Sequence, residues 1–183
     1  MKKTKKLALA ATLSALGVVI LAIGSFIQVL DISSAALAGF VIIIAVIELG
    51  GYYPVLMYFA ISVLSLLILP NKITALHFIF FGGSYPIFKA HFERFHFIAA
   101  WSVKFSLFNI LLFIMIFTVI FLVEYGFLPP LEDNSLYDFL GNFKILAFAV
   151  ANFVFLLYDI AMSRIINLYI VKIRGIMGFK NYF

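Results

Sequence analysis

Long apolar runs, separated by short breaks of polar residues, glycine and proline, occupy most of the chain. A helix needs about 20 predominantly apolar residues to cross a bilayer, and the runs recur at about that length. The pattern predicts an all-α polytopic membrane protein, a bundle of about six transmembrane helices that forms a single membrane domain over residues 1–183. The expected helices cover residues 7–30, 34–49, 55–69, 73–88, 105–125 and 143–166.

The breaks contain residues that begin or end helices. Asp31, followed by two serines, can cap the second helix, and Pro54 stands where a helix start tolerates proline. The fourth run is the least regular because it contains Gly82-Gly83 and Pro86. These residues predict close helix contact or a kink in this helix.

Two further segments have their own character. Residues 89–104 mix basic groups with aromatic rings, which is typical of an interfacial amphipathic segment. Residues 126–142 contain Pro129-Pro130 and three acidic residues, and are expected to form a long external loop.

Composition supports a membrane protein and limits the chemistry. Of 183 residues, 66% are hydrophobic and 11% charged, against about 45–50% and about 25% in soluble domains. Six spans leave no room for a separate soluble catalytic domain. The absence of cysteine excludes disulfides and thiolate chemistry. The basic N-terminus could begin a signal peptide, but the apolar run after it continues to Leu30 and favours a retained helix.

The net charge of +5 is distributed by topology, which argues against nucleic-acid binding. Short cytoplasmic loops carry an excess of Lys and Arg, so the bias predicts cytoplasmic N- and C-termini in a multi-pass protein of the cell membrane. One side of the six-helix arrangement carries Lys2, Lys3, Lys5, Lys6, Lys89, Arg94, Lys104, Arg164, Lys172, Arg174 and Lys180, and the other only Lys72 and Lys144.

Polar residues in the outer half of the spans are candidates for an outward-facing pocket, because ligand sites combine apolar walls with a few polar groups. This polar set consists of Gln28, Asp31, Ser33, Ser34, Asn71, Lys72, His77 and Asn152. The proposed substrate-binding residues are Gln28, Asn71, Lys72, His77 and Asn152. Lys72 weakly favours an anionic ligand. Structural roles remain open: Asn71 and Lys72 can be turn formers, and His77 can be satisfied by a neighbouring carbonyl.

The remaining ionisable residues favour structural roles over catalysis. Glu48 and Asp159 lie near the inner ends of their helices, where ion pairs explain them better than a proton relay does. His91 and His96 lack the spacing of a His-Glu-x-x-His metal site, and no nucleophile or phosphate-binding motif is present. We therefore expect no catalytic residues, no metal, no cofactor and no enzyme activity.

The first helix concentrates small residues in its first turns. Ala11 and Ala15 are four residues apart and share one face, which lets another helix approach closely, inside the protein or in a partner. With its basic N-terminus and about six helices, the chain resembles the S components of energy-coupling-factor (ECF) transporters, whose first helix carries the Ala-x-x-x-Ala motif found here from Ala11 to Ala15.

The resemblance implies a membrane subunit that captures a vitamin-like or other small molecule from outside the cell. In that family a transmembrane coupling subunit and two ATPases drive uptake, so membrane lipid, these subunits and the small molecule would be the partners. Ala11 and Ala15 would then contact the coupling subunit. The alternative is a non-catalytic membrane assembly or structural factor similar to the rod-shape morphogenesis membrane protein.

Overall fold

The computed structural model describes residues 3–92, 96–128 and 144–173. The chain divides into two compact units, residues 1–131 and 132–183, and each is described by itself. Every regular element in the described residues is helical. In the first unit these are α1 (Lys3–Phe26), η1 (Gln28–Leu30), α2 (Asp31–Glu48), α3 (Tyr53–Ile68), α4 (Lys72–His77), η2 (Phe78–Gly82), α5 (Ser84–Phe92) and α6 (Phe97–Glu124).

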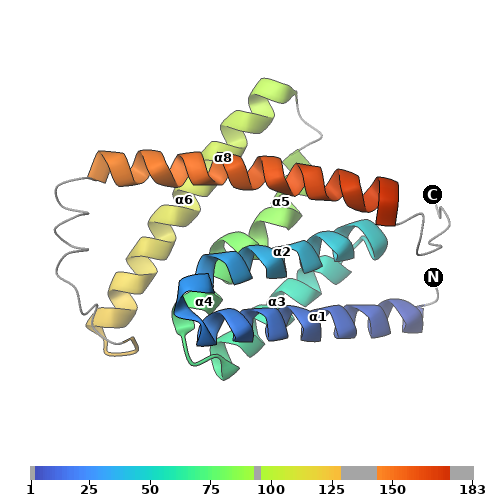
Figure 1. Ribbon diagram of the computed structural model, residues 1–183, viewed down its shortest axis with the longest axis horizontal. Helices are drawn as coiled ribbons and strands as arrows, with labels where there is room; N and C mark the ends of the chain where they lie inside the picture. Colours follow the sequence, from blue (N-terminus) through green and yellow to red (C-terminus); the bar gives the residue numbers. More distant parts are fainter. Residues whose placement is uncertain (1–2, 93–95, 129–143, 174–183) are drawn as a thin grey trace. The chain divides into compact units, whose positions relative to one another are not determined.

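Helix α2 is the centre of the first unit. It contacts α1, α3, α4, η2 and α5, and Figure 1 shows α1 and α2 side by side. Ala38, Ile42 and Ala45 on α2 are fully buried, and Met57 and Ile61 of α3 belong to the same apolar core. Small side chains on α2 allow the neighbouring helices to approach closely, which is how helices pack where lipid removes the hydrophobic driving force.

Glycines mark the closest helix contacts. A Cβ at Gly17 of α1 would lie 2.8 Å from the Cδ1 atom of Ile61, and a Cβ at Gly82 would overlap the backbone carbonyl of Ala35. The close contact predicted for the Gly82-Gly83 pair is therefore confirmed. Helix α1 packs against α2 and α3 through a face that includes Ser14, Gly17 and Leu21.

The fourth apolar run forms three consecutive helical elements rather than one regular helix. In η2 the amide of Gly83 donates to the carbonyl of Phe78 at 2.7 Å, five residues back, which is the hydrogen bond of a π-helix. The hydroxyl of Tyr58 donates to the carbonyl of Ile79 at 3.0 Å. The irregular segment thus receives a hydrogen bond from α3, as a buried backbone group requires.

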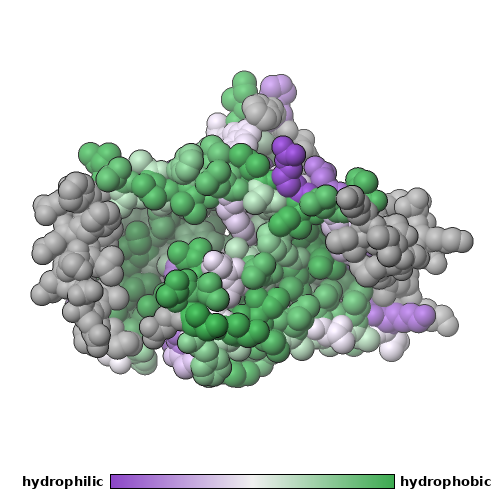
Figure 2. Space-filling view, viewed as in Figure 1, coloured by the Kyte–Doolittle hydropathy of each residue, from purple (hydrophilic) through white to green (hydrophobic). Residues whose placement is uncertain are grey.

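Four helices of the described residues are long and apolar enough to cross a membrane by length and composition: α1, α2, α6 and α8. Helix α3 is a shorter apolar helix of 16 residues. The described part is thus all-helical and suited to a membrane, as predicted, and Figure 2 shows mostly hydrophobic residues on the face it draws. Six spans, their orientation and a single domain stay predictions.

Several boundaries differ from those expected. Helix α1 begins at Lys3 and ends at Phe26, and a separate short turn, η1, follows it. The basic and aromatic segment 89–104 is divided between the end of α5 and the start of α6, so residues 97–104 continue directly into the expected span. Helix α6 contacts η2 and α5, with the rings of Phe81 and Phe108 5.3 Å apart. The expected loop at 126–142 lies mostly outside the described residues.

The second unit contains α8 (Lys144–Leu168), which continues into the π-helical segment η3 (Tyr169–Ile173). Its apolar stretch from Ile145 to Val171 is one of the four candidate spans. The expected helix over residues 143–166 thus corresponds to α8, with a start one residue later and a longer C-terminal end.

Candidate functional site

A polar cluster joins α1, α2 and α4 at the end of the first unit where α2 begins. Asp31, the first residue of α2, accepts a hydrogen bond from Nδ2 of Asn71 at 2.9 Å and a second one from the hydroxyl of Thr74. Its carboxylate lies in the first turn of a helix, where the helix dipole stabilises negative charge. We call Ser25, Asp31, Ser34, Asn71, Thr74 and His77 the Asp31 cluster.

Asn71 connects three helices. Its Oδ1 accepts from the amide of Ile73 at 3.0 Å and caps α4, while its Nδ2 reaches Asp31 on α2. Its backbone amide donates to the hydroxyl of Ser25, near the end of α1, at 2.9 Å. Asn71 and Lys72 were expected to be turn formers after Pro70. The structure shows that Asn71 caps α4 and also connects it with α1 and α2.

Lys72 has a defined structural contact. Its Nζ donates to the carbonyls of Leu66 and Leu69, both at 2.7 Å. These carbonyls belong to the C-terminal end of α3, where backbone acceptors lack partners within the helix and a cation is favoured. The ammonium group is therefore bound by backbone oxygens at this helix end, and the inference that it favours an anionic ligand stays a prediction.

His77 is the member of the Asp31 cluster with an unsatisfied group. Its Nδ1 atom is buried and has no hydrogen-bond partner among the described residues. The side chain as a whole is half-buried, on the last residue of α4. The backbone carbonyl of Ile73, one turn earlier on α4, interacts with the imidazole, as the structural interpretation of a lone histidine expects. Ligand contact by His77 therefore stays a prediction beside this structural role.

The other two predicted binding residues are not shown to join this group. Gln28 begins η1, three residues before Asp31, and its side chain lies outside the described residues. Asn152 belongs to α8 in the second unit, where its Nδ2 donates to the carbonyl of Phe148 at 2.9 Å. Both remain predictions.

Ala11 and Ala15 lie on an exposed face of α1. The α1 residues that are buried are Ala10, Ser14, Gly17, Leu21, Gly24 and Ser25. Small residues of α1 therefore divide between two faces, one used for packing inside the first unit and one open. Packing within the described residues of the first unit accounts for Gly17, which faces Ile61, but not for the face of Ala11 and Ala15.

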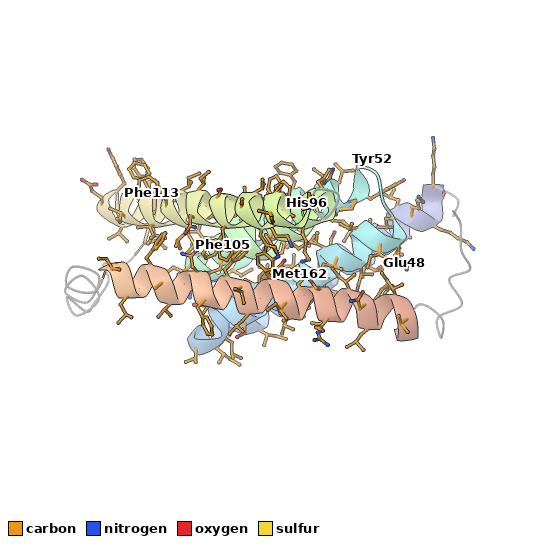
Figure 3. The ribbon with its side chains drawn as sticks, turned by 90° about the horizontal axis from the view of Figure 1, so that it is seen from above. Glu48, Tyr52, His96, Phe105, Phe113 and Met162 are labelled. Atoms are coloured by element: carbon orange, nitrogen blue, oxygen red, sulfur yellow. The ribbon has the colours of Figure 1, made fainter. Side chains whose placement is uncertain are left out.

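The opposite end of α2 is held by a different contact. The Nζ of Lys6 donates to the carbonyl of Leu49 at 3.0 Å and lies 5.8 Å from the ring centroid of Tyr53. Figure 3 labels Glu48 and Tyr52 at this end. Glu48 has an interaction partner of its own. These contacts join the start of α1 to the turn between α2 and α3, as expected for charged residues at a membrane interface.

The chemistry available in the Asp31 cluster is that of binding. It offers a carboxylate, hydroxyls, an amide and an imidazole, and the Thr74 hydroxyl that is bonded to the Asp31 carboxylate is fully buried. Within the described residues, no group of three or more His, Cys, Asp or Glu side chains is placed to hold a metal ion. A polar ligand group that donates to or accepts from His77 and Asp31 fits this set.

Sequence reasoning missed two members of the cluster, Ser25 and Thr74. Both lie in apolar helical segments where a single hydroxyl is normally bonded to the preceding turn, so neither carries a local signal. Comparisons with protein-family models, with curated proteins and with solved structures give no match.

Proposed function

We propose that this chain is the substrate-binding membrane subunit of an ECF-type importer, which captures a vitamin-like or other small molecule from outside the cell. The observation that carries the proposal is the exposed face of α1 with Ala11 and Ala15. A small-residue face without a partner in its own unit suits close packing by a helix of another protein. The resemblance assigns that contact to a transmembrane coupling subunit.

In this proposal the Asp31 cluster contributes to the pocket. His77 supplies a buried ring nitrogen, and Asp31 and Asn71 supply groups that already hold α1, α2 and α4 together. Ligand binding would couple to the arrangement of these helices, because any ligand bonded to Asp31 competes with or reinforces its bonds to α4. ATP would be hydrolysed on partner ATPases, and the chain itself would not be an enzyme.

The test is native mass spectrometry of the protein purified gently from its host, as wild type and as Ala15→Leu. We expect a small molecule and a coupling subunit with two ATPases to accompany the wild type, and the subunits to be lost from Ala15→Leu. Ala60→Leu is the matched control, since Ala60 is an exposed alanine on α3. Wild-type protein without ATPases and without a ligand would contradict the proposal.

A second candidate, a non-catalytic assembly or structural factor, is favoured by one feature of the same cluster. Its hydrogen bonds connect different helices and fix their arrangement, which suits a structural protein. Envelope-assembly proteins in place of ATPases in the same mass spectra would support this candidate, and depletion with unchanged cell shape would count against it.

A further inference from the structure

Positive charge is concentrated at the end of the first unit where α1 begins and α2 ends. The acid at this end is Glu48, the last residue of α2, which has an interaction partner of its own. The opposite end has one acid, Asp31, and one cation, Lys72, while α3 carries no charge. Against the single acid Glu48, the first end has three cations among the described residues of α1 to α4, namely Lys3, Lys5 and Lys6.

Two of these lysines are available to a partner. Lys6 is fixed by its hydrogen bond to the carbonyl of Leu49 and by its position over the ring of Tyr53. Lys3 and Lys5 are exposed, and neither makes a hydrogen bond or an ion pair within the described residues. Lys3 lies three residues before Lys6 and therefore on the same face of α1, about one helical turn beyond the contact with Leu49.

Exposed residues suited to the lipid boundary adjoin these lysines. Leu7 follows them directly and is 62% exposed, and Tyr52, before α3, is also 62% exposed. Tyrosine is enriched at the level of lipid headgroups, and lysine side chains reach outward to the same level. The turn between α2 and α3 leaves room beside them, because a Cβ at Gly50 or Gly51 would meet no atom within 4 Å.

We propose that the N-terminal basic patch, which consists of Lys3, Lys5, Lys6 and Tyr52, binds the headgroup of an anionic phospholipid. The phosphate lies beside the exposed ammonium groups of Lys3 and Lys5, and the acyl chains lie against the apolar surface that begins at Leu7. A headgroup with net negative charge suits this end because its one acid leaves the lysines unbalanced, whereas a zwitterionic headgroup brings a cation of its own. The binding does not depend on whether the protein transports a ligand.

The test measures lipid preference at the two ends of α3 in the full chain. The sequence contains no cysteine, so one fluorophore can be attached at Val55→Cys, near Tyr52, or at Ile68→Cys, the control at the opposite end. These positions are 38% and 63% exposed. In phosphatidylcholine nanodiscs, quenching by brominated phosphatidylglycerol or brominated phosphatidylcholine gives the relative association constants. The pair Lys3→Gln and Lys5→Gln removes the charge, and the pair Lys3→Arg and Lys5→Arg keeps it.

We expect phosphatidylglycerol to bind about fivefold or more tightly than phosphatidylcholine at Val55→Cys, since a lysine near an anionic surface contributes about that factor. The preference at Ile68→Cys should be smaller. The glutamine pair should lower the preference at Val55→Cys below about twofold with an unchanged unfolding midpoint, and the arginine pair should retain it. A smaller preference in the wild-type background, an equal preference at both labels, or a preference that survives the glutamine pair would overturn the proposal.

Discussion

Asp31 and Asn71, 40 residues apart in the sequence, are joined by a 2.9 Å hydrogen bond between a carboxylate and a side-chain amide. The bond connects the start of α2 with the cap of α4. Through Ser25, which accepts from the Asn71 amide, the end of α1 belongs to the same group. Two chain breaks that look independent in the sequence are thus one structural feature.

Removing the carboxylate should destabilise this end of the bundle. Asp31→Ala leaves the Asn71 amide and the Thr74 hydroxyl without their acceptor, and we expect a loss of about 2–3 kcal/mol. Unfolding in detergent micelles measures it. Asp31→Asn retains one acceptor oxygen and should lose less, and Glu124→Ala, which removes an exposed acid, should change little. An equal loss in all three variants would contradict the assigned role.

Gly82 should tolerate no side chain. A Cβ at this position overlaps the carbonyl of Ala35, which is backbone and cannot move aside, so Gly82→Ala should cost about 2 kcal/mol or more. Gly17→Ala is the matched comparison, because its Cβ would meet only the flexible end of Ile61. Unfolding midpoints of the two variants measure the difference. If Gly17→Ala were the more damaging, the contact between α2 and η2 would not be as tight as described.

The hydroxyl of Tyr58 should matter for the π-helical segment. Tyr58→Phe removes the donor to the carbonyl of Ile79 in apolar surroundings, at a cost of about 1–2 kcal/mol. The local effect can be followed by amide hydrogen exchange over η2, which should become faster. Tyr52→Phe, at an exposed position, should leave both stability and exchange unchanged.

Much of the helix content was predictable from the sequence because apolar run length alone determines it. The runs that became α1, α2, α6 and α8 are long and uninterrupted. The close contact at Gly82 was also predictable, since glycine pairs in membrane helices usually serve packing. The π-helical form of η2 was not, because its hydrogen bonds depend on Tyr58, which precedes it by about 20 residues and reaches it only after folding.

The candidate site was predicted only in part. Asn71 and His77 do lie in one polar cluster, since Asn71 caps the short helix α4 and His77 ends it. Lys72 was predicted to bind a ligand because it is a lone cation, and the structure shows that its ammonium group binds the carbonyls at the end of α3. Sequence shows that a charge is present, whereas the groups that its side chain binds depend on how the chain folds back. Ser25 and Thr74 were missed for the same reason.

The exposed face of α1 gives the most direct test of the proposed function. Ala11→Leu and Ala15→Leu should leave the folded protein stable, because both side chains point away from the core of the first unit. The added bulk would block close approach of a partner helix, so we expect loss of the coupling subunit from the purified complex by about tenfold or more. Quantitative mass spectrometry measures this ratio, with unfolding midpoints as the check on stability. Retention of the subunit by both variants would show that α1 is not the contact, even if the wild type binds a ligand.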